Sequence, residues 1–225
     1  MKNIKNFYAI NYFFIAVISM SFFSCDKDDD NNSNNTYVDN FNLSIGDSGP
    51  AGGYVFYVNP DANTDGWKYL EAAPADTEWN YVQWGDADVL VGGTKPGIGH
   101  GDANTEIIVE KLEDYNDGQY AAFLCDNLVV NNDDNVFDDW FLPSKDELNF
   151  IYTNLYDNEP SLGGFSEFNY YWSSTEYEYE TSCAWGQVFY DGSDVDEYPY
   201  PPGYQSPSQK DSEEDVYSAR AVRRF

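Results

Sequence analysis

Carboxylates crowd the stretch that runs from Asp138 to Phe150, DDWFLPSKDELNF. Acid–base catalysis by carboxylates needs two of them in different environments, so that one is protonated while the other is charged. Asp138 and Asp139 are adjacent, which favours a loop that leads into a strand. One of them is expected to pair with Arg220 or Arg223. The sequence therefore predicts no catalytic residues and no enzyme.

A helix is expected to begin inside the same stretch. Ser144 and Glu147 have the spacing of a capping box, in which the serine hydroxyl and the glutamate carboxylate each accept a hydrogen bond from the other residue's backbone N–H. The apolar residues that follow recur at the spacing of one buried helix face: Leu148, Ile151, Tyr152 and Leu155. Most of these acids thus have a structural explanation.

Oxygen-rich side chains gather just before this stretch, in NNDDNVFDD, residues 131–139. Ca²⁺ is bound by several oxygen atoms on a flexible loop, so Asp133, Asp134 and Asp138 are candidate calcium ligands. The Glu-Pro-Asn, Gln-Pro-Asp and Trp-Asn-Asp motifs of sugar-binding C-type lectins do not occur in the chain. Calcium is thus the one cofactor that the sequence suggests.

A second acidic run, Asp61–Gly66, opens like the calcium loop of an EF-hand. The twelfth position of such a loop needs a bidentate glutamate, but here it is Ala72. We therefore expect a turn between two strands rather than a calcium site.

Aromatic rings are the other candidates for ligand contact, because they offer flat, rigid surfaces to sugars or protein side chains. The segment EWNYVQW sets Trp79, Tyr81 and Trp84 in a loop-like region, where core packing is the competing explanation, above all for Trp84. Three more tyrosines lie in a proline-rich loop that is difficult to bury: Tyr198, Tyr200 and Tyr204. Trp79, Tyr81 and these three are the candidate ligand-binding residues.

Cysteine and histidine are scarce. In an oxidising compartment Cys125 and Cys183 permit one intramolecular disulfide, which would stabilise the fold by roughly 4 kcal/mol, and free buried thiols are the alternative. His100 is the only histidine, so any Ser-His-Asp triad or His-based zinc site would have to include it. It lies in the glycine-rich segment GIGHGD and is interpreted as an exposed turn residue.

The N-terminus has the pattern of a secretory signal: Lys2 and Lys5 precede a mostly apolar run that ends in FFSC. Ser24 followed by Cys25 resembles the lipobox of bacterial lipoproteins, which implies a signal peptide over residues 1–24 and lipidation of Cys25. Ordinary cleavage with an incidental cysteine is the alternative. Several acyl chains on one residue would anchor the protein to a membrane without spanning it.

The acids DKDDD that follow Cys25 resemble the export signal that sends Bacteroidota lipoproteins to the outer face of the outer membrane. A solvated linker over residues 25–40 is compatible with the same composition, because such polar residues bury too little apolar surface to fold. We therefore expect a lipid-anchored protein exposed at the bacterial surface.

The net charge excludes one class of partner. Eleven Lys and Arg stand against 40 Asp and Glu, a formal charge of −29. Cleavage before Cys25 would remove Lys2 and Lys5 and leave 9 − 40 = −31. A nucleic acid would meet repulsion over most of such a surface, so it is not an expected partner.

One domain is expected over residues 41–225, with two helices and five strands besides the helix at Ser144. The helices are expected in Asn104–Tyr115, capped by Asn104 or Thr105, and in Asp117–Val130, with Cys125 pointing inward. The strands are expected at Gly53–Val58, Trp67–Glu71, Tyr170–Tyr177, Cys183–Tyr190 and Tyr217–Phe225. Residues 194–215 contain too much proline and acid for the core and are expected to form a loop.

Several segments, read in order from Ile45 to Phe225, resemble the Lcl C-terminal domain family of bacterial surface proteins. They are IGDSGPAGGYVFYV, GWKYLEAAP, GIGHGDANT, DDWFLPSKDEL, YYWSSTEY, CAWGQVF and RAVRRF. The resemblance implies an α+β, C-type-lectin-like fold, with two to three helices on a twisted antiparallel sheet and with the N- and C-terminal strands paired.

A member of that family is a collagen-like adhesin whose terminal domain is associated with trimers and with glycosaminoglycans. The negative charge of the present chain would repel a sulfated polymer, and it has no collagen-like repeat. LPS followed by Glu147 also resembles the formylglycine-generating enzyme family, which needs a pair of cysteines near its C-terminus where this chain has only Cys183.

The resulting prediction is a surface-anchored, non-enzymatic binding or adhesion module that recognises a glycan or protein ligand through its long loops. An envelope enzyme on a formylglycine-generating-enzyme-like fold and a passive structural domain are the alternatives.

Overall fold

Two β-sheets and a hairpin form the framework of the protein in a computed structural model, which describes residues 39–157, 162–190, 192, 200–212 and 217–225. Residues 36–225 make one compact unit. The predicted signal peptide, Cys25 and most of the predicted linker lie outside the described residues, as does Tyr198.

The first sheet has the order β1-β2-β10 and is antiparallel. Its strands are β1 (Tyr54–Val58), β2 (Tyr69–Ala72) and β10 (Val222–Arg224). The N- and C-terminal strands thus belong to one sheet, but β2 lies between them, so the prediction that they pair directly is wrong. Phe225 continues the contact, because its carbonyl oxygen accepts hydrogen bonds from the N–H groups of Lys68 and Tyr69.

The second sheet has the order β3-β9-β6-β7-β8 and is mixed, because β6 and β9 run parallel. Its strands are β3 (Trp79–Asn80), β6 (Asn169–Glu176), β7 (Cys183–Phe189), β8 (Gln205–Gln209) and β9 (Tyr217–Ala219). β8 lies in a segment predicted to be a loop. Its proline, Pro207, is tolerated because β8 is the edge strand.

The last predicted strand is in fact two strands in two different sheets. Ala219 pairs with Trp79 in the second sheet, whereas Val222 pairs with Ala72 in the first. Arg220 lies at the crossing and is buried there. The sequence YSARAVRRF contains no glycine or proline that would indicate such a change of sheet.

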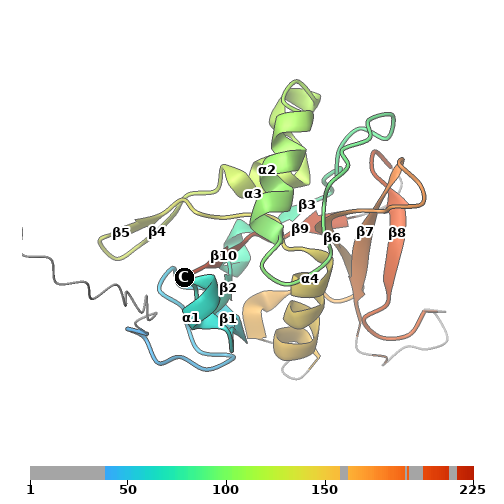
Figure 1. The fold of residues 1–225 in the computed structure, drawn as a ribbon. Coiled ribbons are helices and arrows are strands. Elements are labelled where there is room, and N and C mark those ends of the chain that lie inside the picture. Colours follow the sequence, from blue (N-terminus) through green and yellow to red (C-terminus); the bar gives the residue numbers. More distant parts are fainter. Residues whose placement is uncertain (1–38, 158–161, 191, 193–199, 213–216) are drawn as a thin grey trace, which may run out of the picture. The chain divides into compact units, whose positions relative to one another are not determined.

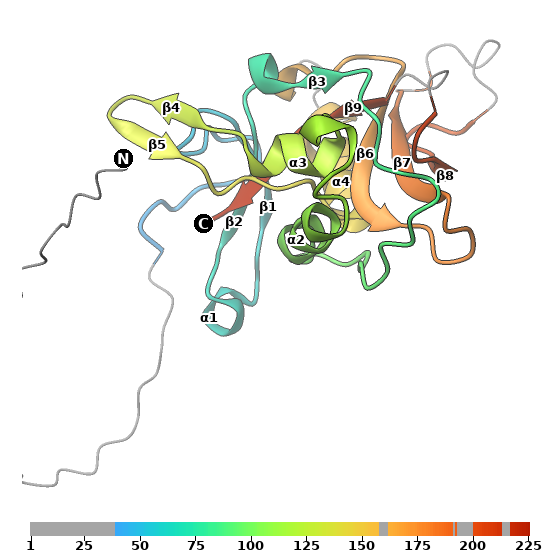
Figure 2. The ribbon, with the colours of Figure 1, turned by 90° about the horizontal axis from the view of Figure 1, so that it is seen from above.

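A third pair of strands, β4 (Val130–Asn132) and β5 (Asn135–Phe137), forms a hairpin where an acidic loop was predicted. Asp133, in the turn, adopts a left-handed backbone with φ of 52°. The hairpin extends away from the rest of the fold in both Figure 1 and Figure 2.

Four α-helices complete the α+β fold: α1 (Ala62–Asp65), α2 (Gly101–Lys111), α3 (Ala121–Asp126) and α4 (Lys145–Ile151). Short 3₁₀ turns occur at Ala75–Thr77, Asn116–Gly118 and Leu162–Gly164, and a π-helical turn, Tyr152–Tyr156, extends α4. The mixed α+β class is confirmed. The turn predicted at Asp61–Gly66 is the short helix α1, which ends at Gly66 in a left-handed conformation.

The predicted helix start is right for α4 and wrong for α2, and the helix predicted at Asp117–Val130 is the shorter α3. Ser144 and Glu147 form the predicted capping box at the start of α4. In contrast, α2 begins at Gly101, so Asn104 and Thr105 lie inside the helix and are buried instead of capping it. Asn104 uses its side chain to bind both backbone groups of Lys95.

Two clusters of buried side chains make up the core. One lies among α2, α3 and the second sheet and includes Trp84, Ile108 and Cys125. The other surrounds α4 and includes Phe56, Ile151 and Val222 of the first sheet. α4 lies between the first sheet and strands β6 and β7 in both views (Figures 1 and 2).

Candidate functional site

A cleft with a volume of about 470 Å³ lies where β3 ends. Its walls are the chain from β3 to Gln83, the turn before α3, and one residue after β8. The lining residues are Trp79, Asn80, Tyr81, Val82, Gln83, Asn116, Gln119, Leu124 and Ser212. We call this site the β3 cleft.

The first wall of the β3 cleft is fixed by β9 and by a tryptophan. Asn80 accepts a hydrogen bond at its Oδ1 from the Ser218 hydroxyl, 2.8 Å away, and it pairs with Ser218 in the sheet. The backbone N–H of Val82 donates to Tyr217, and its carbonyl accepts from the indole of Trp172 at 2.9 Å. Hydrogen bonds therefore hold the residues on both sides of Tyr81.

Gln83 joins the two walls. Its Oε1 accepts from the phenol of Tyr115 at 2.9 Å, and its amide nitrogen donates to the backbone carbonyl of Asp211 at 2.9 Å. Its own carbonyl accepts from the N–H of Ala121, at the start of α3. One side chain and one peptide group thus connect three segments that are distant in sequence.

Strained backbone is concentrated at the cleft. Tyr81 has φ of 60°, and the consecutive residues Asn116 and Asp117 have φ of 47° and 49°. Left-handed conformations cost energy for residues other than glycine, most of all for a bulky one, and they are concentrated at functional sites. At Tyr81 this conformation holds a side chain that is 78% exposed.

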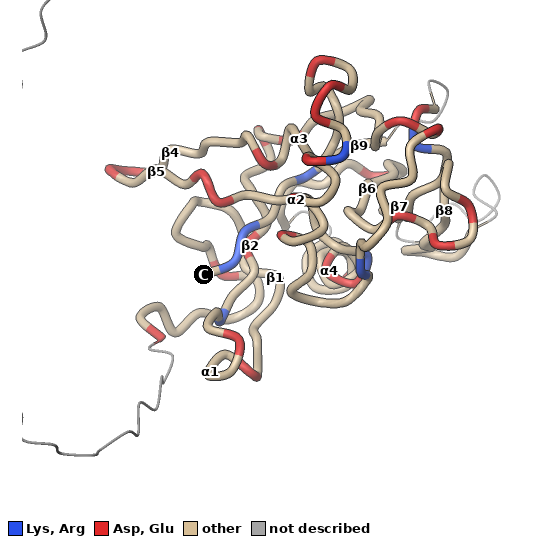
Figure 3. Tube along the Cα trace, turned by 45° about the horizontal axis from the view of Figure 1, so that its top comes forward, with Lys and Arg blue, Asp and Glu red and all other residues tan. Residues whose placement is uncertain are grey.

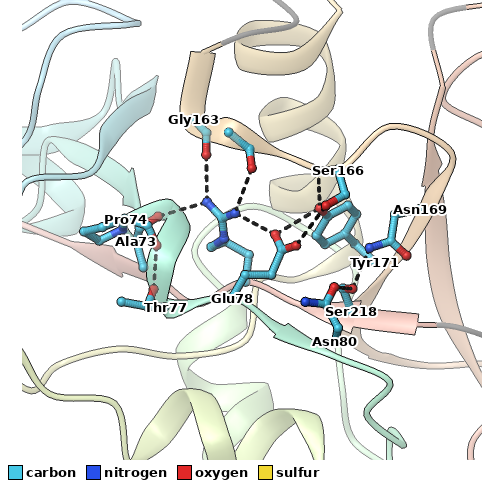
Figure 4. A network of polar contacts seen from close by, with 12 residues as sticks. Ala73, Pro74, Thr77, Glu78, Asn80, Gly163, Ser166, Asn169, Tyr171 and Ser218 are labelled. Atoms are coloured by element: carbon cyan, nitrogen blue, oxygen red, sulfur yellow. Dashed lines mark hydrogen bonds and ion pairs between the residues drawn. The ribbon is translucent and has the colours of Figure 1, made fainter.

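A buried ion pair holds the residue that precedes β3. Glu78, which precedes β3, accepts hydrogen bonds from Arg220 at 2.6 Å and from the phenol of Tyr171 at 2.9 Å. Arg220 also donates to the carbonyl oxygens of Ala73 and Gly163. Figure 4 shows Glu78 and Tyr171 converging in this network. Burial, followed by the charge of Glu78, raises the pKa of Tyr171, which therefore remains a neutral donor.

The side chains that line the cleft suit recognition of a ligand. Its lining combines aromatic rings, carboxamides and a hydroxyl, and it includes no Asp, Glu, His, Lys, Arg or Cys. Proton transfer at neutral pH is most often carried out by groups of those kinds. Binding sites, in contrast, commonly combine apolar and aromatic surface with a few placed polar groups.

The negative charge around the cleft comes from residues behind its wall. Burial, then the carboxylates of Asp211 and Asp86, raise the pKa of Tyr115, whose phenol binds Gln83. Burial and the charge of Asp126 raise the pKa of Tyr120 to about 12. Figure 3 shows acidic residues distributed over much of the described chain, with basic residues at few positions.

The aromatic candidates separate into three groups. Trp79 and Tyr81 both line the β3 cleft. Trp84 is fully buried and donates its indole N–H to Ser173 at 2.7 Å, so the core-packing explanation is right for it. Tyr200 and Tyr204 stack on each other with ring centroids 5.1 Å apart and do not line the cleft.

The candidate calcium ligands are not brought together. Asp133 and Asp134 lie in the turn of the β4–β5 hairpin, whereas Asp138 lines a separate acidic cavity of about 290 Å³ beside Asp102 and Arg224. Among the described residues, no three His, Cys, Asp or Glu side chains have an arrangement that could hold a metal ion. The hairpin separates the aspartates because pairing extends the chain between them.

The predicted disulfide between Cys125 and Cys183 is absent, and both residues are free thiols. Cys125 is wholly buried on α3, as predicted, against the face of the core that α2 and β9 share. Cys183 is half-buried at the start of β7, opposite Gln209 of β8. Burial raises the pKa of the Cys125 thiol well above its ordinary value.

Two carboxylates in the stretch from Asp138 to Phe150 have structural roles. Asp139 forms two hydrogen bonds of 2.8 Å with Arg223, one of the two arginines expected as its partner. Glu147 is fully buried and accepts from the N–H groups of Ser144 at 2.7 Å and Gly99 at 2.8 Å. Burial raises the pKa of Glu147 to about 7 in spite of these donors. His100 occupies the N-cap position of α2 without a side-chain cap.

Two other buried glutamates hold loops in the same manner. Glu71 accepts from the N–H groups of Ala51 and Gly53. Glu176 accepts from Val91 and Gly92 and forms an ion pair of 2.5 Å with buried Lys210. Each of these acids thus binds the backbone of a loop.

Sequence reasoning identified Trp79 and Tyr81 but missed the polar residues of the cleft. Gln83, Asn116, Gln119 and Ser212 carry no motif, and they meet only because the chain folds back after β8. The sequence Asn116-Asp117-Gly118 could have indicated a constrained turn, since Asn, Asp and Gly tolerate the left-handed conformation best. All three residues adopt that conformation.

Comparisons of the chain with protein-family models, characterised proteins and solved structures find no match. Within the described ranges, no helix has the length and apolar composition needed to cross a bilayer.

Proposed function

We propose that this protein is a non-enzymatic binding module that recognises an extracellular glycan or protein ligand in the β3 cleft. The observation that carries the proposal is the lining of the cleft, in which two aromatic residues, four carboxamide residues and a serine meet without any acidic or basic side chain. Such a surface can stack and form hydrogen bonds, and it has none of the acidic, basic or thiol side chains that most often transfer protons at neutral pH.

Preorganisation supports the same proposal. The backbone of Tyr81 is held in a left-handed conformation between two anchored neighbours, so the position from which its ring extends is already ordered before a ligand binds. Among the described aromatic residues with large exposure, it is the one that belongs to the cleft.

The hydrogen bonds and the ion pair that the buried acids form argue against an envelope enzyme. Glu71, Glu147 and Glu176 accept backbone hydrogen bonds, and Glu78 is paired with Arg220. The thiol of Cys125, the more buried of the two described cysteines, has a raised pKa, which disfavours the reactive thiolate.

The proposal extends to fold family and location. A C-type-lectin-like fold of the Lcl C-terminal domain family is supported by the motifs that run in order from Ile45 to Phe225 and by the presence of the first and last strands in one sheet. Lipidation at Cys25 and export to the outer face of the outer membrane would present the cleft to the surroundings.

A binding array tests the proposal. Neutral, acidic and sulfated glycans and extracellular-matrix proteins would be probed with the purified wild-type protein and with Tyr81→Ala. Tyr179→Ala is the matched control, because Tyr179 is 80% exposed, against 78% for Tyr81, and does not line the cleft.

We expect at least one ligand whose binding Tyr81→Ala weakens and Tyr179→Ala leaves unchanged. Binding that neither variant alters would refute the β3 cleft as the site. A complete lack of binding by wild type would refute the binding function and favour a passive structural domain.

A further inference from the structure

We infer that the ligand of the β3 cleft is an uncharged carbohydrate, recognised by ring stacking on Trp79 and Tyr81 and by the carboxamides around them. This inference rests on the proposed binding function and narrows its ligand from glycans and proteins in general to neutral sugars. Three properties of the cleft support it: its charge, its hydrogen-bonding groups and the conformation of its edge.

The charge around the cleft disfavours anionic ligands. Sulfate, phosphate and carboxylate groups are normally bound by Arg or Lys, and none lines the cleft. The described chain holds eight basic residues, that is 11 minus Lys2, Lys5 and Lys27, and four of these are already in ion pairs: Lys210, Arg220, Arg223 and Arg224. The carboxylates of Asp86 and Asp211 act on Tyr115 directly behind Gln83.

The hydrogen-bonding groups suit hydroxyls. Sugar hydroxyls can each donate and accept, so they can be bound by the donor of one carboxamide and by the acceptor of another. The bond from Ser218 to Oδ1 of Asn80 fixes the orientation of this amide and leaves its Nδ2 group as the donor. Asn116 is held in the same way, since its Nδ2 donates to the carbonyl of Gln119 at 3.1 Å, which leaves Oδ1 as the acceptor.

The aromatic rings supply the complementary apolar contact. A pyranose ring has faces of C–H groups, which pack on a flat π-system with its negative face. Trp79 is half-buried on β3, and Tyr81 extends from the adjacent position with most of its ring in solvent. Aromatic surface beside fixed amides is the combination needed for stacking with directional hydrogen bonds.

The edge of the cleft is unsuited to a peptide. A peptide that adds to a sheet needs an extended strand with a row of free N–H and C=O groups. β3 has two residues, and the left-handed Tyr81 interrupts the extended chain directly after it. The next peptide groups are occupied, because the carbonyls of Val82 and Gln83 accept from Trp172 and from Ala121.

Titration with defined oligosaccharides tests the inference. The purified protein would be titrated with gluco-, galacto-, manno- and N-acetylglucosamine oligosaccharides and with uronate and sulfated counterparts of the same length. Each titration would be repeated at about 0.15 M and about 1 M salt, where screening of exposed charges differs greatly. Circular dichroism and melting temperature would verify that Tyr81→Ala and Tyr179→Ala are folded.

We expect a neutral oligosaccharide to bind with an affinity that salt does not change, and Tyr81→Ala to weaken it about tenfold or more while Tyr179→Ala has no effect. If the ligand that depends on Tyr81 is anionic or a peptide, the inference is wrong but the proposed function stands. If a neutral oligosaccharide binds without dependence on Tyr81, the site is wrong. If no oligosaccharide binds, the inference fails, and the proposed function fails with it only if the proteins of the binding array do not bind either.

Discussion

The guanidinium of Arg220 lies 2.6 Å from the carboxylate of Glu78, and both side chains are almost completely buried although they are 142 residues apart in sequence. Glu78 leads directly into β3, and Arg220 lies at the point where the chain passes from one sheet to the other. This ion pair therefore joins the two sheets beneath the wall of the β3 cleft.

Glu78→Gln should destabilise the protein by about 3 kcal/mol, because removing one partner leaves the buried charge of Arg220 uncompensated. Tyr171 would also lose a charged acceptor. Urea unfolding measures the loss, and the exposed Glu110 on α2 provides the control Glu110→Gln, for which we expect less than about 0.5 kcal/mol. Equal stabilities of the two variants would show that the pair does not support the fold.

Glu147 should make the protein less stable as the pH rises toward neutrality. Burial raises its pKa from 4.5 to about 7 in the folded state, so the folded state binds the proton more tightly than the unfolded chain. Its contribution is fully present below pH 4.5 and is lost as the pH rises to about 7, by up to about 3 kcal/mol.

The test compares wild type and Glu147→Gln by urea unfolding from pH 4.5 to 7.5. The difference in unfolding free energy between them should change across this range in the direction given, whereas the exposed Glu106→Gln should follow wild type. Parallel profiles for wild type and Glu147→Gln would mean that Glu147 does not titrate in this range.

The two described cysteines should react as free thiols of different accessibility. In a Cys25→Ser background, the native protein should be labelled first at half-buried Cys183, and Cys125 should react only after unfolding, because its thiol is buried and has a raised pKa. Mass spectrometry of labelled peptides identifies each site.

Reductant should leave the melting temperature unchanged, since no disulfide closes the loop between these residues. If neither thiol is labelled in unfolded, unreduced protein, Cys125 and Cys183 form a disulfide after all, and this part of the structure is wrong.

The sequence predicted features that depend on neighbouring residues. The capping box of Ser144 and Glu147 was predictable because both partners lie within one helical turn. Strands such as β6 and β7 were predictable from their β-branched and aromatic residues. The inward position of Cys125 followed from the spacing of one helix face.

Features that depend on distant contacts were not predictable. The break between β9 and β10 depends on Arg220 reaching Ala73 and Gly163, which no local pattern indicates. β8 was missed because its proline is tolerated only at an edge, and edge position is a property of the whole sheet. The β3 cleft likewise needs Ser212, which is placed when the carbonyl of Lys210 accepts from Trp84.

Hydrogen exchange with and without the oligosaccharide that binds best tests the central claim, which is that the β3 cleft is the ligand site. We predict slower exchange in peptides that cover residues 79–83 and 116–119 when ligand is present. Protection confined to the β4–β5 hairpin around Asp133, or to the stacked pair of Tyr200 and Tyr204, would contradict it.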